Sequence, residues 1–174
     1  MIKAPKIQFI ELIPGDILVY AKSEWISRAI QLLTRSKYNH TGTIGSDGMV
    51  YEAMQQGYIK QKVYISVKDS LQVIVKRPKH PINVNARDSA IFEMHKAKYE
   101  FAGIWYEVKH QLWGGWQGDK EVSKNVFCSK ASAYIEFKQG NETYKEYWST
   151  SPDEIVENTE DFDTFELNLY VFKN

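Results

Sequence analysis

The stretch "SKYNHTGTIGSDGMVYEA", residues 36–53, predicts a short strand, a turn and a second strand. The turn is "SDG", and these residue types favour a tight reversal of the chain. A histidine, His40, stands near the start of the first strand, and a glutamate, Glu52, stands near the end of the second. If the strands pair across the turn, the two side chains approach each other. The hairpin therefore predicts a His40–Glu52 pair, which is either an exposed cross-strand contact or part of a catalytic site.

The segments around this hairpin predict an α+β fold, in which helices pack on a mainly antiparallel sheet. Further strands are predicted at "GDILVY" (15–20), "YIKQKVYISV" (58–67), "LQVIVKRP" (71–78) and "FELNLYVFK" (165–173). Helices are predicted over 23–34, over 86–97, from about residue 128, and at "SPDEIVEN" (151–158). No repeat, low-complexity run or linker interrupts the chain, so residues 1–174 are predicted to form a single domain.

Composition and charge exclude several classes of protein. Hydrophobic residues make up 43% and aromatic residues 14% of the chain, which is typical of a globular domain. Basic and acidic residues number 22 each, so no net field attracts nucleic acid. The beginning of the chain lacks a signal-peptide pattern, and no apolar run reaches the length of a membrane span. We therefore expect a cytoplasmic protein, or one released by host lysis, without a nucleic-acid partner or integral membrane association.

The single cysteine, Cys128 in "NVFCSKASAYIEF", lies where a helix is predicted to begin. A helix N-terminus stabilises a thiolate through its dipole and its free N–H groups, and a thiolate is the nucleophile that acyl transfer requires. The same N–H groups can hold the oxyanion of a tetrahedral intermediate. A lone cysteine is also commonly a small buried apolar residue, so the position of Cys128 leaves both interpretations open.

Four histidines are candidates for the base that would act on this thiol. His80 lies between prolines and is predicted to be exposed in a turn. His95 is predicted on a helix beside its apolar stripe, where a surface or packing role is expected. His110 is the main rival because it precedes a glycine-rich loop. His40 has the advantage of Glu52, since a carboxylate fixes the tautomer of an imidazole and stabilises the imidazolium.

Metal and cofactor chemistry has little support in the sequence. No two histidines have the i, i+3 or i, i+4 spacing of helical metal ligands, and there is no HExxH pattern. Neither GxxxxGK[ST] nor GxGxxG occurs, so a phosphate-binding loop is not predicted. We expect no metal and no cofactor.

Seven segments together resemble a known family. They are "GDILVY", "WISRAIQLLTRS", "YNHTGTI", "VYEA", "YEFAGI", "FCSKASAYI" and "SPDEIVEN". Their order resembles that of the circularly permuted papain-like cysteine hydrolases, the YiiX/YaeF-like branch of the NlpC-type amidase superfamily, which is related to lecithin:retinol acyltransferase. The likeness runs from about Pro14 to Asn158. One departure is Lys130, because many relatives follow the cysteine with Ser-Glu.

This resemblance implies a permuted papain-like fold in which the histidine strand precedes the cysteine helix. Carried over by position, His40 matches the base, Glu52 the orienting residue and Cys128 the nucleophile. The implied function is a cysteine hydrolase that cleaves an amide bond through an acyl-enzyme, in a peptidoglycan-type or other small peptide. One alternative is a lipid or thioester acyl hydrolase or acyltransferase acting on an acyl substrate. A second is a noncatalytic binding module that has kept the fold.

Overall fold

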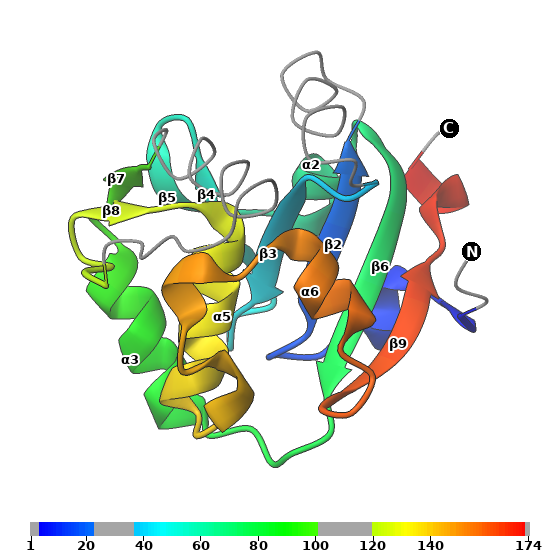
Figure 1. Cartoon of the computed structure of the whole chain (residues 1–174). Helices are drawn as coiled ribbons and strands as arrows, with labels where there is room; N and C mark the ends of the chain where they lie inside the picture. The colour runs from blue at the N-terminus through cyan, green and yellow to red at the C-terminus, as the bar shows by residue number, and fades with distance from the viewer. Residues whose placement is uncertain (1–3, 23–36, 101–119, 173–174) are drawn as a thin grey trace.

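A computed structural model describes residues 4–22, 37–100 and 120–172, and within these ranges the main element is a seven-stranded sheet (Figure 1). Its strand order is β1-β9-β6-β2-β3-β4-β5. The strands are β1 (Lys6–Ile7), β2 (Ile17–Lys22), β3 (His40–Ile44), β4 (Val50–Met54), β5 (Gly57–Gln61), β6 (Ser70–Pro78) and β9 (Phe162–Leu167). Neighbouring strands are antiparallel except for β1 and β9, which are parallel. The predicted α+β fold with a mainly antiparallel sheet is confirmed.

Helices cover both faces of this sheet in the described ranges. They are α2 (Val63–Val67), α3 (Val84–Met94), α5 (Cys128–Lys138) and α6 (Pro152–Glu157). Helices α3, α5 and α6 contribute to the larger apolar core on one face, whereas α2 packs on the smaller core of the other face. Two short strands, β7 (Lys98–Tyr99) and β8 (Asn125–Val126), are paired in parallel, and β8 leads the chain directly into α5 (Figure 1).

Strand β2 occupies the middle of the sheet and is buried along its whole length. Its side chains alternate between the faces, as the pleat requires. Ile17 and Val19 point into the larger core, and Leu18 and Tyr20 point into the smaller one. A strand covered on both sides needs a continuous apolar run, and "ILVY" supplies it.

The strand predicted over residues 58–67 is wrong in its second half, which forms the helix α2. The alternating Val63, Ile65 and Val67 fit the period of a strand. In the structure the buried positions are Val63, Ser66 and Val67, with helical spacing, while Ile65 is exposed. A five-residue segment contains too few positions for its pattern to distinguish the two periods.

Other predictions differ mainly at the ends of elements. The closing strand β9 begins and ends earlier than predicted, and a 3-10 turn (Leu169–Phe172) follows it. Helix α5 begins at Cys128 as predicted, and Gly140, with φ of 99°, follows its last turn. The helix predicted over 23–34 lies outside the described residues. Across residues 4–22, 37–100 and 120–172, every helix is too short or too polar to span a lipid bilayer.

Candidate functional site

The paired strands β3 and β4 bring His40 and Glu52 into direct contact. Thr43 is paired with Tyr51 across the hairpin, and this register places His40 diagonally across from Glu52. His40 Nε2 lies 2.5 Å from Glu52 Oε2. Both side chains are withdrawn from water, since His40 is 7% and Glu52 is 1% exposed. The structure therefore contains the predicted pair, and it is a buried pair and not an exposed cross-strand contact.

Gly42 gives this diagonal contact the space it needs. The register places Gly42 opposite Glu52. Along β3, Gly42 lies between His40 and Ile44. A Cβ atom at Gly42 would lie 2.6 Å from Cγ1 of Val50 and 3.2 Å from Cβ of Glu52. Real Cβ atoms do not approach other atoms as closely as 2.6 Å, so a side chain at this position would force Val50 to shift.

Glu52 is held as a carboxylate although it is buried. Burial alone raises the pKa of a carboxyl group, but hydrogen bonding and charge from His40 oppose this effect. The positive charge of Lys22 and a hydrogen bond from the Ser66 hydroxyl act in the same direction, and together they lower the pKa of Glu52 to about 2. The second oxygen, Oε1, accepts a hydrogen bond from Gln61 Nε2. Glu52 is thus a fixed negative charge beside the imidazole.

His40 is correspondingly held as an imidazolium. Burial lowers its pKa, but the charge of the Cys128 sulfur and a hydrogen bond with that sulfur oppose this effect. Hydrogen bonding and charge from Glu52 add to the increase, so the pKa of His40 rises to about 9. Because Glu52 contacts Nε2, the other ring nitrogen, Nδ1, remains for the sulfur. The imidazole therefore interacts with a carboxylate on one side and a thiol on the other.

Cys128 reaches this imidazole from the first turn of α5. Phe127 is the N-cap residue and its side chain makes no capping hydrogen bond, while α5 packs against β3 and β4. The first N–H groups of an α-helix have no intrahelical acceptor, so the sulfur lies beside backbone donors and the positive end of the helix dipole. Cys128 is buried at the edge of the larger core. The sulfur, imidazole and carboxylate of the three predicted site residues are thus gathered in one place.

The other histidines have different surroundings. His80 was predicted to be exposed, but it is half-buried and its Nε2 lies 3.0 Å from Oε2 of Glu136, so that prediction is wrong. Glu136 is fully buried on α5, and its carboxylate attracts the ring of His80. His95 ends α3 on the surface, where it stacks on Phe92, as a surface role predicts. His110 lies outside the described residues.

Sequence reasoning missed a set of side chains around the His40–Glu52 pair. Tyr20 pairs directly with His40 across β2 and β3, and the two rings are 5.3 Å apart. The Tyr20 hydroxyl shares a hydrogen bond of 2.7 Å with the hydroxyl of Ser66 on α2. Gln61 could have been found from a three-strand meander, because it lies two residues beyond the partner of Glu52 on β5. Ser66 could not, because its helix was predicted to be a strand.

Lys130, where the sequence departs from the pattern it resembles, is buried and paired. It is 0% exposed, and its Nζ lies 3.0 Å from Oε2 of Glu100. The same ammonium donates to the backbone oxygen of Asn125 at 3.0 Å and to that of Glu121 at 3.3 Å. Lys130 therefore ties the chain on both sides of residues 101–119 to the first turn of α5.

Comparisons with known proteins give the fold but no family. No model of a known protein family matches the sequence, and no curated protein matches it. Among solved structures the chain is similar to the metalloprotein YiiX from Escherichia coli O157:H7, with a TM-score of 0.51 and 18% identity. The similarity covers 89% of this chain and 96% of YiiX. The two proteins share an α+β fold over nearly their whole lengths.

The description of YiiX as a metalloprotein raises the question of a metal site in this chain. Across the part of the chain that the structure describes, no group of three or more His, Cys, Asp or Glu side chains is arranged to hold a metal ion. The described residues therefore do not fit a metal centre with three or more such ligands.

Proposed function

We propose that this protein is a cysteine-dependent hydrolase that cleaves an amide bond through an acyl-enzyme, with Cys128 as nucleophile, His40 as base and Glu52 as orienting residue. The observation that carries this proposal is that His40 interacts with both Glu52 and the Cys128 sulfur. Its Nε2 lies 2.5 Å from Glu52, and its pKa is raised to about 9, with the Cys128 sulfur as the largest cause of the increase. A buried imidazolium between a sulfur and a carboxylate is the resting state of an activated thiol nucleophile.

The reaction would follow from this geometry in two halves. The Cys128 sulfur attacks the carbonyl carbon, and the backbone N–H groups at the start of α5 stabilise the oxyanion. His40 donates its proton to the leaving amine, which departs and leaves an acyl group on sulfur. His40 then removes a proton from water, and the hydroxide attacks the thioester, which releases the acid and restores the thiolate of Cys128 beside the imidazolium of His40. Throughout, Glu52 stabilises the imidazolium and fixes the ring orientation.

The permuted papain-like fold belongs to the same proposal. The chain reaches the base first, in β3, then the orienting residue in β4, and only later the nucleophile at the start of α5. This is the order that the resemblance to the permuted branch implies. The same resemblance supports a peptidoglycan-type or other small peptide as substrate, and an amide as the bond that is cleaved.

The test is to trap the acyl-enzyme and locate it. We expect incubation with short peptides of the peptidoglycan type, followed by an acid quench, to add the mass of the acyl fragment to the intact protein, at Cys128. Cys128→Ser, which keeps the size of the side chain, should form no thioester. Glu52→Gln should stay folded but form the adduct at least about 100-fold more slowly, because the imidazolium loses its counter-charge. Glu93→Gln, at a half-buried glutamate of α3 outside the proposed triad, is the matched control.

Acyl thioesters and lipid esters are tested in parallel, because their adducts would identify the alternative acyl substrates. If only these probes form an adduct, the bond that the enzyme cleaves is an ester or thioester and not an amide. If no probe acylates Cys128, or if Glu52→Gln forms adducts at the wild-type rate, the proposed hydrolase is wrong.

A further inference from the structure

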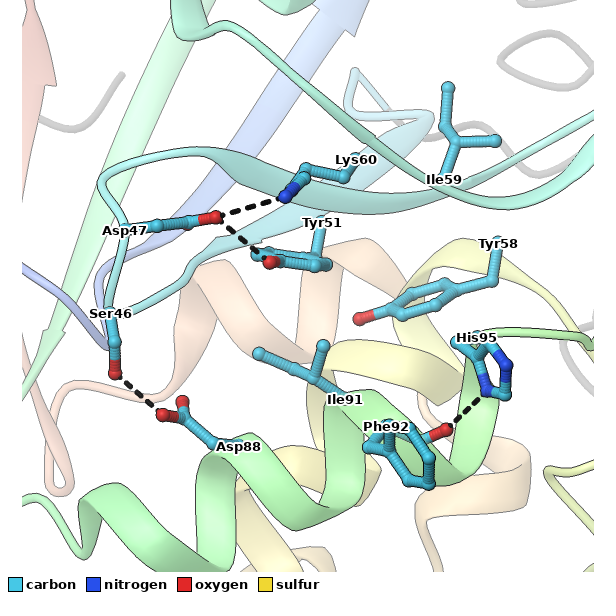
Figure 2. A pocket seen from close by; sticks show the side chains of 10 residues that line it. All are labelled: Ser46, Asp47, Tyr51, Tyr58, Ile59, Lys60, Asp88, Ile91, Phe92 and His95. Atoms are coloured by element: carbon cyan, nitrogen blue, oxygen red, sulfur yellow. Dashed lines mark hydrogen bonds and ion pairs between the residues drawn. The ribbon is translucent and has the colours of Figure 1, made fainter.

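A second candidate site lies between the strands β4 and β5 and the helix α3 (Figure 2). It is a pocket of about 560 Å³, a size typical of small-molecule sites. Tyr51 lines it from β4, Tyr58 and Lys60 from β5, and Ile91 from α3. Because side chains alternate along a strand, Tyr51 and the neighbouring Glu52 point to opposite faces of the sheet. The pocket thus shares a strand with the His40–Glu52 pair but opens on the other side.

The hydroxyl of Tyr58 points to a ligand in this pocket. Tyr58 is 7% exposed, and no hydrogen-bond partner for its hydroxyl exists among the described residues. Figure 2 shows the hydroxyl directed into the space between Tyr51 and Ile91. Buried polar atoms in proteins are almost always hydrogen-bonded, and phenylalanine would fill the same volume without an unmet hydroxyl. Burial, with smaller contributions from Tyr51 and Glu52, raises the pKa of Tyr58, so the hydroxyl keeps its proton and can donate it.

The charged groups at the mouth of the pocket are already matched. Asp47 lies 3.4 Å from the ammonium of Lys60, and Asp88 lies 3.0 Å from the guanidinium of Arg87. Each of the two carboxylates that line the pocket is therefore paired with a cation, Asp47 with Lys60 in the lining and Asp88 with Arg87 outside it. A charged ligand would find no unmatched counter-charge here, so the pocket favours a neutral one.

The walls of the pocket favour a flat ring. The rings of Tyr51 and Tyr58 are 6.4 Å apart and inclined by 31°. Phe92 stacks on His95 with ring centroids 4.9 Å apart, yet its side chain is 70% exposed. Aromatic faces arranged around an open space bind another aromatic ring through offset or edge contacts, and such a ligand would also cover Phe92.

We propose that this pocket binds a small neutral aromatic molecule that carries a hydrogen-bond acceptor, and that the Tyr58 hydroxyl donates to this acceptor. None of the residues that line the pocket belongs to the proposed triad. The site is therefore independent of the proposed hydrolase, and either proposal can fail alone.

The test compares two probes of the same shape. Acetophenone carries a carbonyl oxygen where α-methylstyrene carries a methylene group, so only acetophenone can accept a hydrogen bond. We expect NMR titrations of the whole protein to give a dissociation constant about 3- to 10-fold lower for acetophenone. Tyr58→Phe should remove this preference while leaving the affinity for α-methylstyrene unchanged. Tyr64→Phe, which removes the hydroxyl of an exposed tyrosine on α2, is the matched control and should change neither value.

Two further variants separate this site from the rest of the molecule. Phe92→Ala removes an exposed ring and should weaken both probes to a similar extent, because both stack on it. Cys128→Ala should alter neither affinity, because binding in this pocket does not depend on the proposed catalytic thiol. The proposal is overturned if neither probe binds, if the wild-type protein binds both equally, or if Tyr58→Phe weakens both alike.

Discussion

Glu52 and His40 owe their contact to a residue that has no side chain. Gly42 lies between them in the hairpin, and its missing side chain lets the imidazole of β3 reach the carboxylate of β4 diagonally. The need for glycine here arises from packing, since Gly42 has no positive φ. The same absence also lets the hydroxyl of Tyr20 approach within 3.3 Å of the place that a Cβ would take.

Gly42→Ala should therefore damage the site as well as the fold. The added methyl group would lie 2.6 Å from Val50, and we expect the free energy of unfolding to fall by about 1–3 kcal/mol, with slower alkylation of the thiol. Gly140→Ala is the control, because Gly140 has open space but a φ of 99°. It should lower stability by about 1 kcal/mol and leave thiol alkylation unchanged. Urea unfolding and iodoacetamide labelling give both values, and normal stability and labelling in Gly42→Ala would contradict this account.

Among the elements, α5 holds the proposed nucleophile at its start and two buried ionisable side chains along its length. Lys130 and Glu136 are both fully buried. Lys130 is paired with Glu100, and Glu136 is paired with His80, so each charge has a partner on another segment. Pairs of this kind add little net stability, but breaking one leaves a buried charge alone.

Lys130→Met should test the connection between α5 and the β7–β8 pair. The variant leaves Glu100 and two backbone oxygens without their donor, so we expect the free energy of unfolding to fall by about 3 kcal/mol or more. Lys130→Met combined with Glu100→Gln should recover part of this loss, because the unpaired carboxylate is then removed. Urea unfolding monitored by tryptophan fluorescence gives the three values. A single variant as stable as the wild type would show that the ammonium does not tie these segments together.

Elements with a clear local pattern could be predicted from the sequence. The hairpin has its turn residues and α5 has its apolar face, so the His40–Glu52 pair and the position of Cys128 at a helix start both followed from short-range information. Three other features depend on contacts between distant segments, so they could not be predicted from the sequence. They are the parallel pairing of β1 with β9, the burial of His80 against Glu136, and the folding of Val63–Val67 as a helix.

At the scale of the whole molecule, burial of the His40–Glu52 pair couples its ionisation to folding. His40 has a pKa of about 9 in the folded protein and an ordinary value of 6.5 when unfolded. Its contribution to stability is therefore complete below pH 6.5 and is lost as the pH rises to about 9. Glu52, with a pKa lowered to about 2, contributes above its ordinary value of 4.5 and loses this contribution only as the pH falls toward 2.

Wild-type protein should accordingly lose the part of its stability that comes from His40 between pH 6.5 and pH 9. His40→Gln removes the titrating group and should be less stable at pH 6 but nearly independent of pH across this window. His80 also has a raised pKa, from its hydrogen bond to Glu136, so His80→Gln is measured as the control for the second pair. Parallel slopes for the wild type and His40→Gln in urea unfolding would mean that His40 is not held as an imidazolium.

The most direct measurement of the central claim is the rate at which iodoacetamide alkylates Cys128, followed from pH 6 to pH 10 in the wild type and in His40→Ala. If the imidazolium of His40 activates the sulfur, the wild type should react at least about tenfold faster than the variant at pH 7. The two rates should converge as the pH rises through about 9, where His40 loses its proton. Equal rates at pH 7, with both proteins following the profile of an ordinary thiol, would contradict the account.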